Sequence, residues 1–127
     1  MNLVSFFAVG LGAFAGAVLR WLLSLALNPV LPQLPLGTLA ANLIGALVMG
    51  FAIGAFAHYD TIPLAARLAI TTGFLGGLTT FSAFSGETVG LILRGHYAWT
   101  ALMIVAHVVG SLVLTLAGVG IMRLALR

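Results

Sequence analysis

Long uncharged stretches separate the few charged side chains of this sequence. Only 6% of its 127 residues are Asp, Glu, Lys or Arg, against about 25% in a typical soluble domain. A helix needs about 20 mostly apolar residues to cross the hydrocarbon core of a bilayer, and several of the uncharged stretches reach that length. The composition therefore favours a membrane protein. The charged residues are Arg20, Asp60, Arg67, Glu87, Arg94, Arg123 and Arg127.

Prolines and short polar segments divide the chain into four predicted membrane-spanning helices. Three prolines in residues 28–35, NPVLPQLP, separate the first two helices, because proline lacks the N–H donor that a helix interior needs. Residues 58–63 and 94–97 separate the later helices. The expected fold is an all-α membrane protein, with residues 1–127 as a single transmembrane domain. The predicted spans cover about residues 3–27, 36–57, 63–94 and 97–122.

The arginines give the chain almost no preferred orientation in the membrane. Cytoplasmic loops normally carry an excess of Lys and Arg. With four spans, Arg67, Arg123 and Arg127 share one side, Arg20 and Arg94 share the other, and lysine is absent. Such a chain could insert both ways and pair as an antiparallel dimer, or could insert in one weakly preferred orientation. The arginines also form no basic patch, so a nucleic-acid partner is not expected.

Glycines spaced four residues apart recur in three of the predicted spans. Small residues at this spacing let helix backbones approach closely, which favours helix association in lipid. Close packing, within one chain or between chains, is therefore expected at these positions. The pairs are Gly12 and Gly16, Gly50 and Gly54, and Gly86 and Gly90.

The middle of the third span has low helix propensity. Gly73, Gly76 and Gly77 are followed there by Thr79 and Thr80, and each glycine costs a helix about 1 kcal/mol relative to alanine. A break at this depth would expose backbone carbonyls that can hold an ion. A continuous helix that packs closely at its glycines is the alternative, and the spacing alone leaves both open.

Two aromatic residues follow this weak segment on one helix face. Phe81 and Phe84 are three residues apart, and Ser85 and Thr88 lie near the same stripe. The positive edge of a phenylalanine ring can approach an anion while remaining compatible with hydrocarbon. Packing in a core would also account for the two rings.

Further polar residues lie within the predicted spans. The Asn42 amide could donate to an anion or bind another helix, and His107 and Ser111, spaced i, i+4, could form a polar track or structural hydrogen bonds. Glu87 is the only acid within a span, and a charged carboxylate on an anion path would repel the anion. Hydrogen bonds or an arginine such as Arg20 are therefore expected to neutralise it, or it lies at a vestibule.

Three motifs resemble the Fluc (CrcB) family of fluoride channels. They are GAVLRW at 16–21, GTLAANLIG at 37–45 and TGFLGGLTTFSAFSGET at 72–88, and the similarity extends over the chain. The resemblance implies a fluoride-specific channel rather than an enzyme, which exports fluoride passively through the cell (inner) membrane. It also implies an antiparallel, dual-topology homodimer whose third helix is broken at its middle, with a structural Na⁺ at the dimer centre.

The same resemblance implies roles for individual residues. The backbone carbonyls of Gly76 and Thr79 would bind Na⁺, and Arg20 and Glu87 would be vestibule or structural charges. The fourth span departs from the family pattern of a tyrosine and two serines, because this chain has Met103, His107 and Ser111 there; the histidine could replace a hydroxyl as an N–H donor. The fluoride pathway would comprise Asn42, Phe81, Phe84, His107 and Ser111, with Thr38, Thr80 and Ser82 as supporting hydroxyls.

Three rival functions differ in what they require of the sequence. A proton-coupled fluoride transporter would use Glu87 as its proton site. A small proton-coupled transporter of the multidrug-exporter type also has four short spans in a dual-topology dimer, but it needs an acid in the first span, where this chain has only Arg20. A structural membrane protein would use its glycines for packing alone.

Overall fold

The computed structural model describes residues 1–127, and it contains only helices and short connections. Four segments are long and apolar enough to cross a membrane, which confirms the predicted all-α membrane architecture with four spans. The fourth continues beyond its expected end at residue 122 to Ala125. The four segments are Leu3–Val30, Leu36–His58, Leu64–Leu93 and Tyr97–Ala125.

The third span is assembled from several short pieces, whereas the other three are dominated by single long helices. A seven-residue π-helical segment occupies Ala69–Leu75, and no feature of the sequence had predicted it. Residues 79 and 80, between α4 and α5, have extended backbone. The α-helices are α1 (Leu3–Leu27), α2 (Leu36–His58), α3 (Leu64–Leu68), α4 (Gly76–Leu78), α5 (Phe81–Leu93) and α6 (Tyr97–Ala125).

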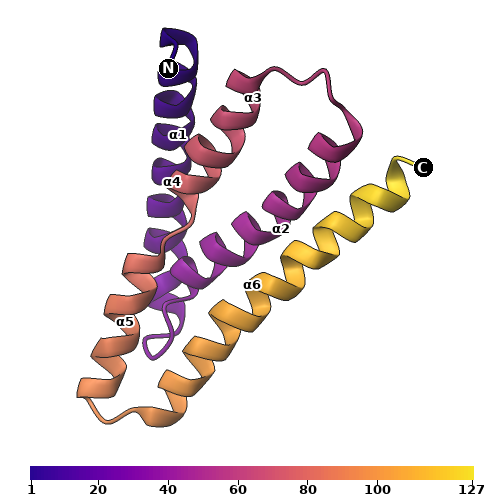
Figure 1. Cartoon of the computed structure of the whole chain (residues 1–127). Coiled ribbons are helices and arrows are strands. Elements are labelled where there is room, and N and C mark those ends of the chain that lie inside the picture. The colour runs from indigo at the N-terminus through magenta and orange to yellow at the C-terminus, as the bar shows by residue number, and fades with distance from the viewer.

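The spans pack in two neighbouring groups. The pieces α3 and α4 run beside α1, and α2 runs beside α6 (Figure 1). Helix α5 diverges from the line of α4 and packs against α6. Both chain ends and the connection between α2 and α3 lie toward the upper part of Figure 1, whereas the turn between α5 and α6 lies at the lower end. This arrangement is the one that an even number of spans requires.

Polar side chains and one glycine shape the connections. The Asn28 side chain accepts a hydrogen bond from the Gly37 N–H at 2.7 Å and so satisfies a donor at the start of α2. Arg67 donates to the carbonyls of Tyr59 at 3.0 Å and Ile62 at 3.1 Å, which closes the loop before α3. Gly95 ends α5 with φ of 74°, a left-handed conformation that favours glycine.

Two of the three predicted glycine pairs pack within the chain. Added Cβ atoms on Gly12 and Gly16 would meet backbone atoms of the third span, and those on Gly50 and Gly54 would meet α6. The prediction of close packing is confirmed for these pairs. The third pair differs, because Gly86 has no neighbour within 4 Å and Gly90 approaches only the Arg94 side chain.

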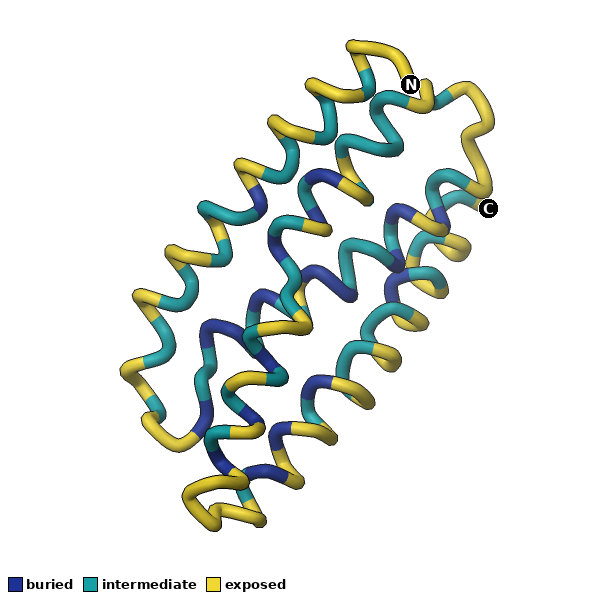
Figure 2. Tube along the Cα trace, turned by 60° about the vertical axis from the view of Figure 1, so that its left-hand side comes forward, coloured by how far each residue is buried: buried dark blue, intermediate teal, exposed yellow.

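Most of the apolar surface faces outward. Only 20 of the 127 residues are buried, eight of them on α2, and Figure 2 shows the buried positions mostly on the inner sides of the helices. One small core contains Leu34, Phe84, Leu91 and Met103. Since the outer faces are apolar, lipid or another protein surface must cover them.

Candidate functional site

The extended residues of the third span are held by one side chain of α2. Thr80 has φ of −149° and ψ of 116°, so its backbone groups cannot join the helical hydrogen-bond pattern. The Thr80 N–H donates to Asn42 Oδ1 at 2.7 Å, and Asn42 Nδ2 donates to the Thr80 carbonyl at 3.0 Å. A membrane interior offers no bulk water to exposed backbone groups, so Asn42 supplies the partners that the extended backbone needs.

Backbone carbonyls lose their usual helical donors at this point, and those of Gly76 and Thr79 are among them. In a continuous helix the Thr80 N–H would donate to the Gly76 carbonyl, and the Ala83 N–H would donate to the Thr79 carbonyl. Here Thr80 donates to Asn42, and Ala83 donates to the Thr80 hydroxyl at 3.1 Å, which caps α5. The carbonyls of Gly76 and Thr79 are therefore released from those bonds.

Two phenylalanine rings follow on the first turns of α5. The ring centroids of Phe81 and Phe84 lie 5.5 Å apart in an edge-to-face arrangement. Phe84 is buried against the His107 ring of α6, at 4.6 Å between centroids and 33° between planes. Phe81 is 77% exposed, so its ring extends away from the chain's own core and toward whatever covers this face.

A cavity of about 490 Å³ lies between α2, the third span and α6. It brings together most of the polar and aromatic residues that the sequence had singled out. Two further hydroxyls on its wall, those of Thr71 and Thr115, were missed. Thr115 continues the i, i+4 series of His107 and Ser111, so the sequence could have predicted its place on the cavity wall. Thr71 precedes Gly76 by five residues, and only the π-helical segment places residues at this spacing on one face. The predicted residues at the cavity are Asn42, Gly76, Thr79, Thr80, Phe81, Phe84, His107 and Ser111.

The other predicted hydroxyls lie outside this cavity. Thr38 lies one helical turn before Asn42 on α2, and it donates to Glu87 Oε1 of α5 at 2.7 Å. The second carboxylate oxygen of Glu87 is buried without a partner. The Ser82 hydroxyl is 3.2 Å from the Thr80 hydroxyl and is exposed.

Arg20 and Glu87 do not pair with each other within the chain. Arg20 Nε donates to the carbonyl of Gly77 at 3.1 Å, because α1 packs along α4. Glu87 is on α5, which packs against α6, and it bonds to Thr38 of α2. Within the chain, Glu87 therefore receives a hydrogen bond from Thr38 and makes no ion pair with Arg20.

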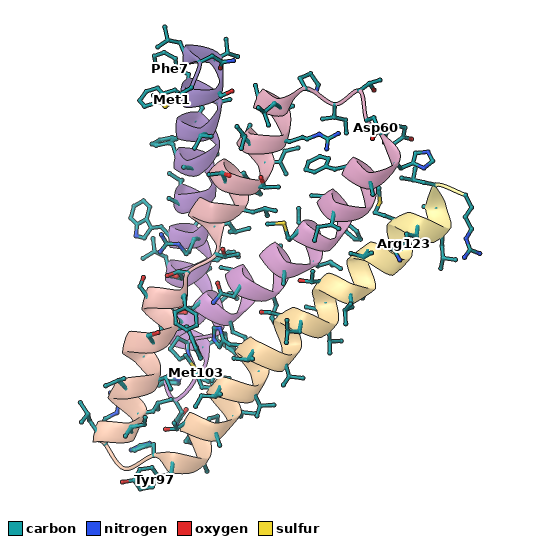
Figure 3. All side chains as sticks on the ribbon, viewed as in Figure 1. Met1, Phe7, Asp60, Tyr97, Met103 and Arg123 are labelled. Carbon is teal, nitrogen blue, oxygen red and sulfur yellow. The ribbon has the colours of Figure 1, made fainter.

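Met103 and His107 of the fourth span lie in different surroundings. Met103 is fully buried and packs with Phe84 and Leu91, and Figure 3 places it on the side of α6 that faces α5. His107, one turn later, is 4% exposed, and its Nδ1 lies 3.0 Å from Asn42 Nδ2. The polar part of this span within the cavity therefore begins at His107.

These features define a small multi-pass membrane protein with a polar site inside its third span. The family model described as CrcB-like protein, Camphor Resistance (CrcB), matches residues 7–119. The chain therefore belongs to the CrcB family.

Proteins named fluoride-specific ion channel FluC are similar over nearly the whole chain. The one from Nitrosospira multiformis is 56% identical, over 94% of this chain and 93% of its own. The Ralstonia pickettii protein is 54% identical over 93% and 94%, and the Tolumonas auensis protein is 50% identical over 98% of both chains. Their name describes ion channels and no enzyme.

Proposed function

We propose that this protein is a fluoride-specific channel, which lets fluoride leave the cytoplasm down its electrochemical gradient. The observation that carries the proposal is identity of 50–56% with proteins of that name over at least 93% of this chain. In bacteria, a multi-pass protein of this class lies in the inner membrane. Neither a catalytic residue nor an energy source is needed, because conduction is passive.

The chemistry of fluoride explains why a passive channel would be useful. Hydrogen fluoride is a weak neutral acid, so it enters a cell from acidic surroundings and dissociates in the more alkaline cytoplasm. The anion is then trapped until a pathway releases it. Such a pathway must replace the hydration shell of the ion at several weak sites, and it reduces fluoride toxicity by lowering the internal concentration.

The cavity wall supplies groups suited to this task. The edges of Phe81 and Phe84 offer positive ring hydrogens. Asn42 of α2, together with His107 and Ser111 of α6, adds polar groups on the facing helices. Thr80 and Ser82 provide hydroxyls at the start of α5. Thr38, one turn before Asn42 on α2, donates to Glu87 of α5 and extends the polar region. Arg20 donates to the Gly77 carbonyl of α4.

We further propose that the chain works as an antiparallel, dual-topology homodimer. Three observations support this assembly: the small arginine bias, the largely apolar exterior and the high exposure of Phe81. An exposed aromatic ring beside an open cavity is better suited to contact with a second chain than with lipid alone. The pair Gly86 and Gly90, which packs against no other helix of the chain, would be available to that second chain.

A structural Na⁺ at the centre of the dimer is part of the proposal. Hard cations prefer oxygen ligands such as backbone carbonyls. The carbonyls of Gly76 and Thr79 have lost their helical donors and lie at an interruption of the third span, which fits such a site. Two chains would together offer four carbonyls. The cation would hold the two interrupted spans together, without being transported.

Reconstitution in liposomes tests the channel directly. Vesicles loaded with potassium fluoride are diluted into fluoride-free buffer, and valinomycin is added to allow potassium to follow. We expect rapid efflux of fluoride at a fluoride electrode with equal pH on both sides, and little efflux of chloride from matched vesicles. Efflux that requires a proton gradient would instead support a proton-coupled transporter. No efflux above protein-free vesicles would favour a structural protein.

Dialysis tests the sodium proposal. Protein transferred from sodium to N-methylglucamine buffer should lose fluoride efflux and regain it when sodium returns. Full activity after complete exchange would contradict a required Na⁺.

A tag at the carboxyl terminus tests dual topology. Equal labelling of the tag from both sides of a cell membrane would support dual topology, and labelling from one side only would contradict it.

A further inference from the structure

The orientation of the Asn42 amide is determined by the backbone of Thr80. A backbone N–H can only donate and a backbone carbonyl can only accept. The Asn42 atom at 2.7 Å from the Thr80 N–H must therefore be its oxygen, and the atom at 3.0 Å from the Thr80 carbonyl must be its nitrogen. A flipped amide would place donor against donor and acceptor against acceptor.

This orientation also determines which nitrogen of His107 carries the proton. Asn42 Nδ2 lies 3.0 Å from His107 Nδ1, and an amide nitrogen only donates. His107 Nδ1 must therefore be the acceptor, and a neutral imidazole that accepts at Nδ1 carries its hydrogen on Nε2. Asn42 has two amide hydrogens, and both are used, one by Thr80 and one by His107.

The opposite nitrogen of His107 is a donor without a partner. His107 is 4% exposed, and its Nε2 is buried with no hydrogen bond in the chain. The ring packs against Phe84, at 4.6 Å between centroids. His107 also lines the cavity shared with Phe81 and Ser111. A buried, unpaired N–H costs the desolvation of the group, and an acceptor within hydrogen-bond distance of Nε2 would remove that cost.

We propose that the Nε2–H of His107 is the donor to the conducted anion beside Asn42, and that Asn42 is a positioning residue for the His107 ring. This inference rests on the proposed function. Asn42 cannot donate further while it binds Thr80 and His107, so the donor role passes to the histidine. The ligand is a small anion that accepts hydrogen bonds strongly, as fluoride does. A neutral N–H holds such an anion more weakly than a cation would, which suits an ion that must also leave.

Nuclear magnetic resonance of the reconstituted protein tests the tautomer and the contact. The protein is labelled with ¹⁵N-histidine, and a His58→Gln, His96→Gln background removes the two other histidines, both of which are exposed. We expect a protonated Nε2 and an unprotonated Nδ1. Titration with sodium fluoride should shift the Nε2–H resonance, while sodium chloride at equal concentration should not. A protonated Nδ1, or no response to fluoride, would overturn the inference.

A pair of variants tests the same donor by function. The amide of His107→Gln can place an N–H near the position of Nε2, whereas His107→Asn can keep only the group that faces Asn42. We expect His107→Gln to retain fluoride efflux within a few-fold and His107→Asn to lose about tenfold or more. Equal efflux from His107→Asn and the unmodified protein would refute the inference.

The outcomes for the unmodified protein separate this inference from the proposed function. If the unmodified protein releases no fluoride, the channel proposal fails, and the tautomer is still read from the resonances. If it releases fluoride but the Nε2–H resonance does not respond, only the role of His107 fails. Size-exclusion chromatography shows whether either variant folds poorly. In that case the fluoride titration of the unmodified His107 still decides whether its Nε2–H contacts the anion.

Discussion

Asn42 binds both backbone hydrogen-bonding groups of Thr80, at 2.7 Å and 3.0 Å, and thereby replaces the helix that is interrupted there. One side chain of α2 thus completes the backbone of the third span.

Replacement of Asn42 should destabilise the protein as well as stop conduction. Asn42→Leu leaves the N–H and the carbonyl of Thr80 without partners, and each unpaired buried group costs about 1–3 kcal/mol. The measurement is the unfolding midpoint in mixed micelles, followed by tryptophan fluorescence. Ser85→Ala is the control, because no hydrogen bond of the Ser85 hydroxyl is present. An unchanged midpoint for Asn42→Leu would contradict this role.

Adjacent glycines of the third span should respond differently to alanine. A Cβ on Gly77 would collide with the backbone carbonyl of Ala13 in α1, whereas a Cβ on Gly76 has only the Thr71 carbonyl nearby, at 3.7 Å. Gly77→Ala should therefore lower the free energy of unfolding by about 1–3 kcal/mol. Gly76→Ala should change the stability of a single chain little, yet reduce association if the proposed dimer packs there. Equal losses of stability would show that the two glycines are not distinguished in this way.

The contact between Thr38 and Glu87 predicts a contrast between two conservative changes. Thr38→Val removes the one hydrogen bond that Glu87 receives and should cost about 1–3 kcal/mol. Glu87→Gln keeps an oxygen that can accept from Thr38, so its stability should remain close to that of the unmodified protein. Voltage-driven fluoride efflux should also persist in Glu87→Gln, measured at equal pH. Loss of efflux in this variant, with its fold intact, would favour a role for the carboxylate in proton coupling.

The contribution of Arg67 to stability should depend on the geometry of its guanidinium group more than on its charge. Its guanidinium donates to two loop carbonyls and lies over the Phe56 ring, 5.2 Å from the centroid. Lysine keeps the charge but not the planar fork. Arg67→Lys should therefore lower stability by about 1 kcal/mol, while Arg127→Lys, at an exposed end, should have no effect. Thermal unfolding in detergent provides the comparison, and identical behaviour of the two variants would argue against a structural role of the fork.

The sequence predicts the spans well because their limits depend on local chemistry. Prolines near residues 29–35 and the polar turn at residues 94–97 act on the backbone wherever they occur. The clustering of Asn42 with Thr80 and Phe84 could also be anticipated, from the motifs that carry the family resemblance. These features need no knowledge of how distant helices approach one another.

Relations between side chains of different spans were harder to predict. Pairing of Arg20 with Glu87 is reasonable from charge alone, but α1 places Arg20 against Gly77 while α2 provides Thr38 for Glu87. The tautomer of His107 likewise depends on the orientation of Asn42, which Thr80 determines. In each case a contact across spans decides between alternatives that composition and spacing treat as equal.

The number of residues in the π-helical segment at Ala69–Leu75 determines the direction in which the following site residues point. A wider turn holds about one residue more than an α-helical turn, and one residue corresponds to about 100° of rotation about the helix axis. Loss of a single residue there would restore a regular helix and turn Gly76 and Thr79 away from their present direction, although every site residue would still be present. The direction of the site should therefore tolerate a change of one apolar side chain in this segment better than an insertion or a deletion.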